Sequence, residues 1–156
     1  MEEYRRKNSI RRPGWNYQCS AYYFITICCW NRASLFASYD KDELTLLPAG
    51  QICYGLWNSL PERTKDIELG AFVVMPDHFH AILGLFPESA TNVGSEVRLF
   101  KSAVTREIRL QLNKPELKVW QRGYHDRILR NQTEYMQASE YIIKNPERGN
   151  DSLEWS

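Results

Sequence analysis

An apolar segment interrupted by a single short break constrains the fold of this chain more than any other feature. Residues 68–74 and 78–85 are both rich in apolar and β-branched side chains, which is typical of buried strands. Only Met75, Pro76 and Asp77 separate them, and a connection this short with proline and aspartate predicts a tight turn. The two segments are therefore expected to form neighbouring antiparallel strands.

Two of the three histidines of the chain lie at the start of the second segment. His78 and His80 flank Phe79. Because alternate side chains of a strand share one face, the two histidines should point the same way while Phe79 points into a core. Their Cα atoms would lie roughly 7 Å apart, so both imidazoles could reach one divalent cation. The alternative is a pair of surface histidines without a ligand role.

The remaining patterns complete an alternating order of strands and helices. They predict a central strand over 22–30, a helix over 48–60, a helix over 96–112, a mixed strand and loop over 120–129, and a final helix. Asn131 and Glu134 have capping-box spacing and should start this last helix. Pro146 should end it near Asn145, because proline disfavours helical geometry in the preceding residue. The order predicts an α+β domain: an RRM-like or ferredoxin-like antiparallel sheet with helices on one face and an extra C-terminal helix.

Length and composition predict one domain over residues 1–156, with a basic arm over 1–16. The chain has four cysteines, namely Cys19, Cys28, Cys29 and Cys53. They form neither a CxxC pair nor a zinc spacing. Together with the lack of a signal peptide, they predict reduced thiols and a cytoplasmic protein. No apolar run is long enough to cross a membrane.

The formal net charge of +1 hides local clusters of basic residues. One cluster consists of Arg5, Arg6, Lys7, Arg11 and Arg12, and a later one of Lys118, Arg122, Arg127 and Arg130; Lys101, Arg106 and Arg109 lie on the helix predicted over 96–112. Such residues commonly form only a solvated surface. Beside a histidine pair of metal-binding type, an anionic partner such as nucleic acid is the better interpretation.

Tyr141 stands out in the final helix. Tyr135, Met136, Ile142 and Ile143 can form a buried stripe, whereas Tyr141 falls among Glu134, Gln137, Lys144 and Asn145 on the other, mostly polar side. Tyr141 and Asn145 are four residues apart and should be neighbours along one edge. Core packing does not explain a tyrosine among polar groups.

Four further segments accompany His78-Phe79-His80 along the chain. They are Arg5-Arg6-Lys7-Asn8-Ser9-Ile10-Arg11, Met75-Pro76-Asp77-His78, Val119-Trp120-Gln121-Arg122-Gly123-Tyr124 and Glu140-Tyr141-Ile142-Ile143-Lys144-Asn145-Pro146. The histidine triplet resembles the HUH motif (histidine, bulky apolar residue, histidine) of the single-tyrosine transposases. In order and spacing, the segments together resemble the REP-associated branch of that family, the RAYT proteins.

This resemblance implies a metal-dependent DNA transesterase. Tyr141 would attack a phosphodiester of single-stranded DNA beside a hairpin, release a 3′-hydroxyl and form a 5′-phosphotyrosine adduct, which a second 3′-hydroxyl reverses. His78, His80 and Asn145 would hold a divalent metal, Mg²⁺ or Mn²⁺. The basic residues Arg5, Arg6, Arg11, Arg12, Lys101, Arg122, Arg127 and Arg130 would contact the DNA. Among similar proteins both monomers and homodimers occur, so a homodimer is one expected assembly.

Several residues keep an alternative interpretation. Tyr124 is a rival nucleophile, or else a packed aromatic or a base-stacking platform. Asn145 could instead cap the helix before Pro146. Asp77 stands where the family more often has asparagine; we interpret it as capping the turn, with hydrogen bonding to His78 as the alternative.

Two aromatic neighbours of the basic cluster and two functional alternatives also stay open. Trp120 packs in the core or stacks on a base, and His125 is a partly exposed histidine or a DNA contact rather than a ligand. An RRM-like sheet with a vestigial site would bind hairpin DNA or RNA without chemistry. A metal hydrolase is the third hypothesis, although the sequence offers no water-activating carboxylate beside the histidine pair.

Overall fold

The computed structural model describes residues 9, 10 and 14–148. The elements are β1 (Ser9–Ile10), β2 (Ala21–Cys28), the 3₁₀ helix η1 (Trp30–Arg32), β3 (Ala37–Asp40), β4 (Glu43–Leu46), α2 (Pro48–Asn58), α3 (Leu60–Arg63), β5 (Ile67–Val74), β6 (His78–Leu85), α4 (Val93–Gln111), β7 (His125–Leu129) and α5 (Gln132–Arg148). Arg5, Arg6, Arg11 and Arg12, predicted to contact DNA, lie outside the described residues.

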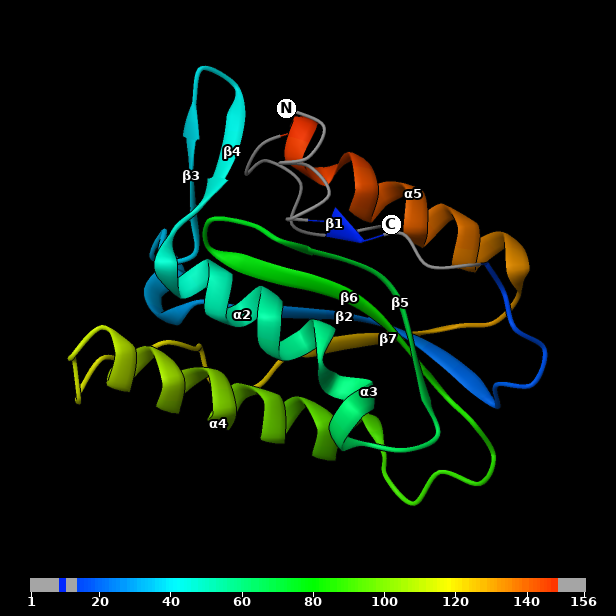
Figure 1. The fold of residues 1–156 in the computed structure, drawn as a ribbon. Coiled ribbons are helices and arrows are strands. Elements are labelled where there is room, and N and C mark those ends of the chain that lie inside the picture. Colours follow the sequence, from blue (N-terminus) through cyan, green and yellow to red (C-terminus); the bar gives the residue numbers. More distant parts are fainter. Residues whose placement is uncertain (1–8, 11–13, 149–156) are drawn as a thin grey trace.

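The main sheet has the predicted antiparallel arrangement, with strand order β1-β5-β6-β2-β7 (Figure 1). Leaving aside the two-residue β1, the four strands follow the order of a ferredoxin-like βαββαβ unit. The backbone N–H of Met75 donates to the carbonyl of His78 at 2.9 Å and closes the β5–β6 hairpin. The prediction of a tight turn at Pro76 and Asp77, and with it the α+β fold, is confirmed.

Helices cover both faces of this sheet. In Figure 1, α2 and α4 lie on one side and α5 on the other. On the first side, Phe79 packs against Trp57 of α2 and Phe100 of α4, with ring centroids 5.2 Å apart in both pairs. On the second side, Tyr135, Ala138 and Ile142 of α5 are buried against the sheet at helical spacing. Side chains that alternate along β6 therefore face two separate cores.

Side-chain caps fix where the two long helices begin. The Asn92 carboxamide oxygen accepts a hydrogen bond from the backbone N–H of Ser95 at 2.9 Å, so α4 begins three residues before the predicted Glu96. Asn131 accepts from the backbone N–H of Glu134 at 2.9 Å, which confirms the predicted start of α5.

The predicted end of α5 is wrong. The helix continues through Pro146 to Arg148, although proline leaves the Ile142 carbonyl without its usual helical donor. Burial of Ile142 and Asn145 holds this last turn in helical geometry. The Pro146 carbonyl itself accepts a hydrogen bond from the Tyr39 hydroxyl at 3.0 Å.

Tyr39 belongs to a β3–β4 hairpin that the sequence patterns did not predict. Its two strands have only four residues each and form a separate two-stranded sheet. Lys41 and Asp42, at its tip, have positive φ values of 52° and 70°, as expected of a tight two-residue hairpin turn. In the part of the chain that the structure describes, no helix is long and apolar enough to cross a membrane.

Candidate active site

The HUH-like histidines lie on β6, on the face covered by α5. His78 is paired with Cys28 of β2, and His80 is paired with Thr26, two residues away on each strand. Both imidazole side chains are fully buried, and their ring centroids are 4.7 Å apart. The prediction that they share one face while Phe79 enters the opposite core is confirmed.

One nitrogen of each imidazole is held by a neighbouring polar side chain. The Nδ1 atom of His80 lies 2.9 Å from the Thr26 hydroxyl, and Nδ1 of His78 lies 2.8 Å from a carboxylate oxygen of Asp77. The other oxygen of Asp77 accepts from Nη2 of Arg32 at 2.8 Å and from its Nε at 3.1 Å. The interpretation of Asp77 as a turn cap is wrong, because partner side chains engage both of its oxygens.

Burial and charge set the ionisation of this group. Burial raises the pKa of Asp77, but the hydrogen bond and charge of His78, followed by Arg32, lower it below its usual value overall. An ionised carboxylate can only accept, so His78 donates through Nδ1 to Asp77, and Nε2 is the acceptor atom when the ring is neutral. Burial, and then the charge of His78, lowers the pKa of His80 well below its usual value.

The second nitrogen of each ring has no hydrogen-bond partner in the part of the chain that the structure describes. Both Nε2 atoms, of His78 and of His80, are buried without a hydrogen-bond partner among the described residues. Buried polar atoms are rarely left so, and imidazole nitrogens oriented by a carboxylate or hydroxyl are typical metal ligands. Within the described part of the chain, no group of three or more His, Cys, Asp or Glu could hold a metal. The pair therefore fits a metal that takes its remaining ligands from other groups, such as an amide oxygen, water or phosphate.

Tyr141 of α5 lies beside this pair. Its ring centroid is 5.6 Å from that of His80 and 6.1 Å from that of Phe24. Asn145, one helical turn later, is fully buried. The interpretation of Tyr141 as part of a polar surface is wrong: it is only 6% exposed, whereas Met136, assigned to the buried stripe, is 43% exposed. The stripe that faces the sheet includes Tyr141 and Asn145 because α5 is rotated about its axis relative to the predicted face.

Tyr124, the rival nucleophile, lies elsewhere. It precedes β7 and packs, partly buried, against the core on the α4 side of the sheet. Burial and the charge of Asp126 raise the pKa of its hydroxyl. The structure thus brings Tyr141 to the histidine pair and leaves Tyr124 on the other face.

The predicted DNA-contacting cations that the structure describes fall into two groups. Arg127 is exposed and paired with Phe24 across β2 and β7, so it shares the face of the histidines, and the exposed His125 shares this face opposite Thr26. Arg130 follows at the exposed end of β7. Lys101 and Arg122 lie on the α4 side; the Lys101 ammonium donates to the carbonyls of Gln121 and Gly123 at 2.9 and 2.8 Å.

Two residues of the site escaped the sequence reasoning. Thr26 could have been found from strand register, because it lies opposite His80 on the neighbouring strand. Arg32 carries no such signal, since it lies in an irregular 3₁₀ turn with a positive φ of 53°. Only the folded chain brings it to Asp77.

Comparison with known proteins agrees with this fold. The family model described as "Transposase IS200 like" matches residues 17–145, and the chain belongs to that family. An uncharacterized protein of Haemophilus influenzae is 32% identical over an alignment covering 90% of this chain and 88% of that protein.

The REP-associated branch is also represented among the similar proteins. The REP-associated tyrosine transposase of Escherichia coli is 31% identical over 85 residues, which is 54% of this chain and 47% of that protein. A solved structure of a REP-associated tyrosine transposase bound to a REP hairpin superposes with a TM-score of 0.63 and 22% identity, covering 89% of this chain and 74% of the other. A structure described as a transposase from Deinococcus radiodurans has a TM-score of 0.50 and 22% identity, covering 88% and 97%. The predicted resemblance to RAYT proteins is confirmed.

Proposed function

We propose that this transposase-family chain nicks and rejoins single-stranded DNA at hairpin elements through a 5′-phosphotyrosine intermediate on Tyr141. The observation that carries the proposal is the position of Tyr141, whose ring centroid lies 5.6 Å from that of His80. Among the described residues, the Nε2 atoms of both neighbouring imidazoles have no hydrogen-bond partner. A nucleophile next to a phosphate-activating site is what a transesterification requires. The solved relative bound to a REP hairpin supports hairpin DNA as the substrate class.

The chemistry balances without a nucleotide cofactor. The Tyr141 oxygen bonds to phosphorus as it loses its proton, the bond from phosphorus to the 3′ oxygen breaks, and that oxygen leaves as a hydroxyl after gaining a proton. Attack by a second 3′-hydroxyl on the phosphotyrosine reverses the sequence and regenerates the tyrosine. Each step exchanges one phosphodiester for another, so the bond energy is conserved.

His78, His80 and Asn145 would hold a divalent cation, for which we propose Mg²⁺ or Mn²⁺. When bound, such an ion polarises a phosphate and stabilises charge that develops on its oxygens. The site has no thiolate among its proposed ligands, which favours these ions over zinc. Asp77 and Thr26 fix the two imidazole rings, and Arg32 in turn fixes Asp77.

The proposal includes the cellular setting and assembly. The four cysteines are free thiols, in keeping with a cytoplasmic protein. A homodimer stays a prediction, which light scattering of the purified full chain tests directly.

The test incubates the full chain with end-labelled single-stranded hairpin DNA from its own genomic flanks, with Mn²⁺ or with chelator, and resolves the products on denaturing gels. The proposal expects a slower band that requires metal, persists in Tyr124→Phe and is absent in Tyr141→Phe. These two variants are matched, because each removes one tyrosine hydroxyl. Tight hairpin binding without any adduct would instead favour a vestigial hairpin-binding protein.

A further inference from the structure

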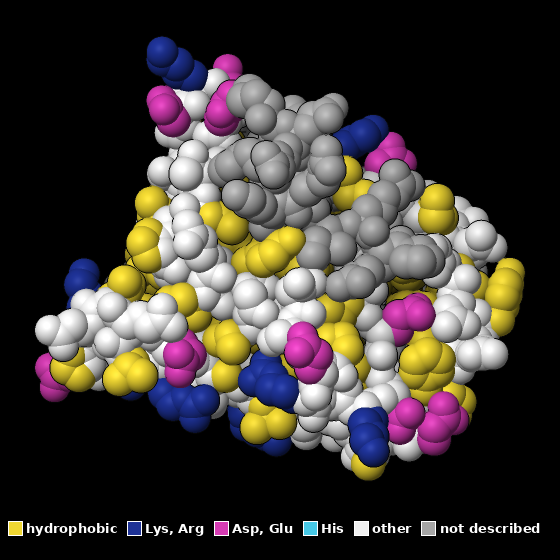
Figure 2. All heavy atoms as spheres, in the orientation of Figure 1, with side chains coloured by type: hydrophobic (Ala, Val, Ile, Leu, Met, Phe, Trp, Pro, Cys, Tyr) yellow, Lys and Arg dark blue, Asp and Glu magenta, His cyan; other side chains and the backbone are white. Residues whose placement is uncertain are grey.

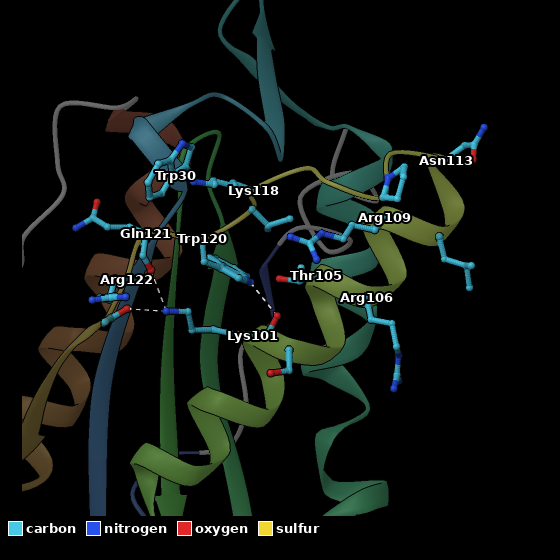
Figure 3. A pocket seen from close by; sticks show the side chains of 15 residues that line it. Trp30, Lys101, Thr105, Arg106, Arg109, Asn113, Lys118, Trp120, Gln121 and Arg122 are labelled. Carbon is cyan, nitrogen blue, oxygen red and sulfur yellow. Dashed lines mark hydrogen bonds between the residues drawn. The ribbon is translucent and has the colours of Figure 1, made fainter.

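A cavity of about 920 Å³ opens on the α4 side of the sheet, away from the face of the histidine pair. Its walls are the C-terminal half of α4 and the segment 113–123, with Trp30 of η1 at the rim (Figure 3). Its volume is at the upper end of the range for ligand sites. In Figure 2, several Lys and Arg side chains project from the edge of the molecule that α4 occupies in Figure 1.

The lining of this cavity is strongly cationic. Among the described residues it includes Lys101, Arg106, Arg109, Lys118 and Arg122 and no carboxylate, in a chain with 20 basic and 19 acidic residues. A local excess of this kind concentrates anions at the surface.

The basic residues of the cavity fall into two groups, those that bind backbone carbonyls and those that are exposed to solvent. Lys101 and Arg109 are used by the fold, since they donate to backbone carbonyls of the segment 113–123. Arg106, Lys118 and Arg122 are exposed and remain available to an anionic ligand. Arg106 lies 3.8 Å from the carboxylate of Glu107, which does not line the cavity.

An exposed aromatic ring accompanies these charges. Trp30 is 39% exposed, and the Lys118 ammonium lies 4.5 Å from its ring centroid. Trp120 forms the inner wall, fixed by a 3.2 Å hydrogen bond from its Nε1 to the Lys101 carbonyl. Proteins that bind single-stranded nucleic acid commonly combine cations that contact the phosphates with an aromatic ring on which a base stacks.

The cavity is connected to the histidine pair through the end of β2. Gln121, in the cavity wall, donates its backbone N–H to the carbonyl of Cys28, the residue paired with His78. The short η1 turn carries Trp30 to the cavity and Arg32 to Asp77. The end of β2 and the η1 turn therefore join the cavity wall to the residues beside the histidine pair.

We propose that this cavity holds nucleotides of the DNA strand that flank the scissile phosphate, with a base stacked on Trp30 and phosphates on Arg106, Lys118 and Arg122. The inference rests on the proposed function, because it takes the flanking strand of that reaction as its ligand. It adds a second DNA-contact region, on the opposite side of the sheet from Tyr141. Through this region the affinity for hairpin DNA depends on the length of the single-stranded flank.

The test uses the full chain carrying Tyr141→Phe and fluorescein-labelled hairpins in two forms, with flanks of about two or about ten nucleotides, to span the site sizes of single-strand binders. Fluorescence anisotropy then gives the dissociation constant for each. Adding Trp30→Ala should weaken binding of the long-flank hairpin by about 5- to 100-fold and leave the short-flank hairpin unchanged. Trp30→Phe should restore most of the loss.

The charged residues give an independent readout. Lys118→Gln and Arg122→Gln should each reduce the slope of log K against log salt by about 0.7, for the long-flank hairpin only. Lys65→Gln, at an exposed lysine before β5, is the matched control and should change neither hairpin. An equal effect on both hairpins, or no effect on either, would overturn the proposed cavity site.

The two proposals fail separately. If the chain with its native Tyr141 forms no adduct with either hairpin, but binding still depends on Trp30 and on flank length, then the proposed chemistry is wrong and the cavity site stands. If the adduct forms and Trp30→Ala leaves the binding of both hairpins unchanged, the chemistry stands and the cavity site is wrong.

Discussion

The contact between Asp77 and His78 predicts how much the Asp77 carboxylate raises the affinity of the proposed site for its metal. Asp77 accepts from Nδ1 of His78 at 2.8 Å and is itself held by Arg32. This pair of contacts fixes the orientation of the His78 ring, with Nδ1 turned toward Asp77. Removing the carboxylate frees the ring to rotate and removes a charge-assisted hydrogen bond.

The expected magnitude follows from the geometry. Losing a residue that orients a metal-ligating histidine lowers metal affinity by about 10- to 100-fold, or about 1.4 to 2.7 kcal/mol, and we expect Asp77→Ala to fall in this range. Asp77→Asn keeps an oxygen that can accept from His78 but loses the charge, so we expect a loss below about 10-fold. Arg32, whose side chain is 38% exposed, stays hydrated when its partner is lost.

The assay is titration of the metal-free full chain with Mn²⁺, with the free ion followed by electron paramagnetic resonance. Asp126→Asn is the control, since Asp126 is an exposed carboxylate on β7 paired with Ile25 and faces away from the histidines. If Asp77→Ala folds normally and binds Mn²⁺ as tightly as the unmodified chain, the assigned role of Asp77 is refuted.

Three further predictions concern the scaffold. Phe100→Ala should lower the free energy of unfolding by about 3–5 kcal/mol in urea denaturation, because the ring is fully buried between α4 and the sheet and packs against Phe79; a loss below about 1 kcal/mol would contradict the packing described. Burial, followed by the charges of Glu68 and Cys19, raises the pKa of Tyr135 to about 12, so the folded chain keeps this proton to higher pH than the unfolded chain. The Tyr135 contribution to stability should be constant below about pH 10 and be lost as pH rises from about 10 to 12, by up to about 3 kcal/mol; urea titrations at about pH 8 and about pH 11 should show a smaller alkaline loss for Tyr135→Phe, and an equal loss would refute the assignment. Pro146→Ala returns a helical donor to the Ile142 carbonyl and should stabilise the chain by about 1 kcal/mol in thermal melts, whereas a lower Tm would show that proline is needed in the last turn of α5.

The strands and the histidine pair could be predicted from sequence because their signals are local. Period-two burial and the Pro76–Asp77 break fix a hairpin, and the hairpin fixes which face each histidine takes. The cap at Asn131 is likewise local and correct. The β3–β4 hairpin was missed because four-residue strands are too short for their periodicity to be recognised.

The errors concern features that tertiary packing decides. The rotation of α5 about its axis depends on how it packs against β5 and β6, so Tyr141 was assigned to a polar face although the fold buries it. The same packing carries the helix through Pro146, against the local preference of the residue before proline. Asp77 could not be assigned because its second partner, Arg32, comes from a turn 45 residues earlier.

The most direct test of the central claim identifies the atom that carries the DNA. The chain with its native Tyr141 is reacted with hairpin DNA and Mn²⁺, the covalent product is digested with protease and nuclease, and the modified peptide is sequenced by mass spectrometry. We predict a 5′-nucleotide linked through phosphate to Tyr141. A nucleotide on Tyr124, or the absence of any modified tyrosine while the hairpin is cleaved, would contradict it.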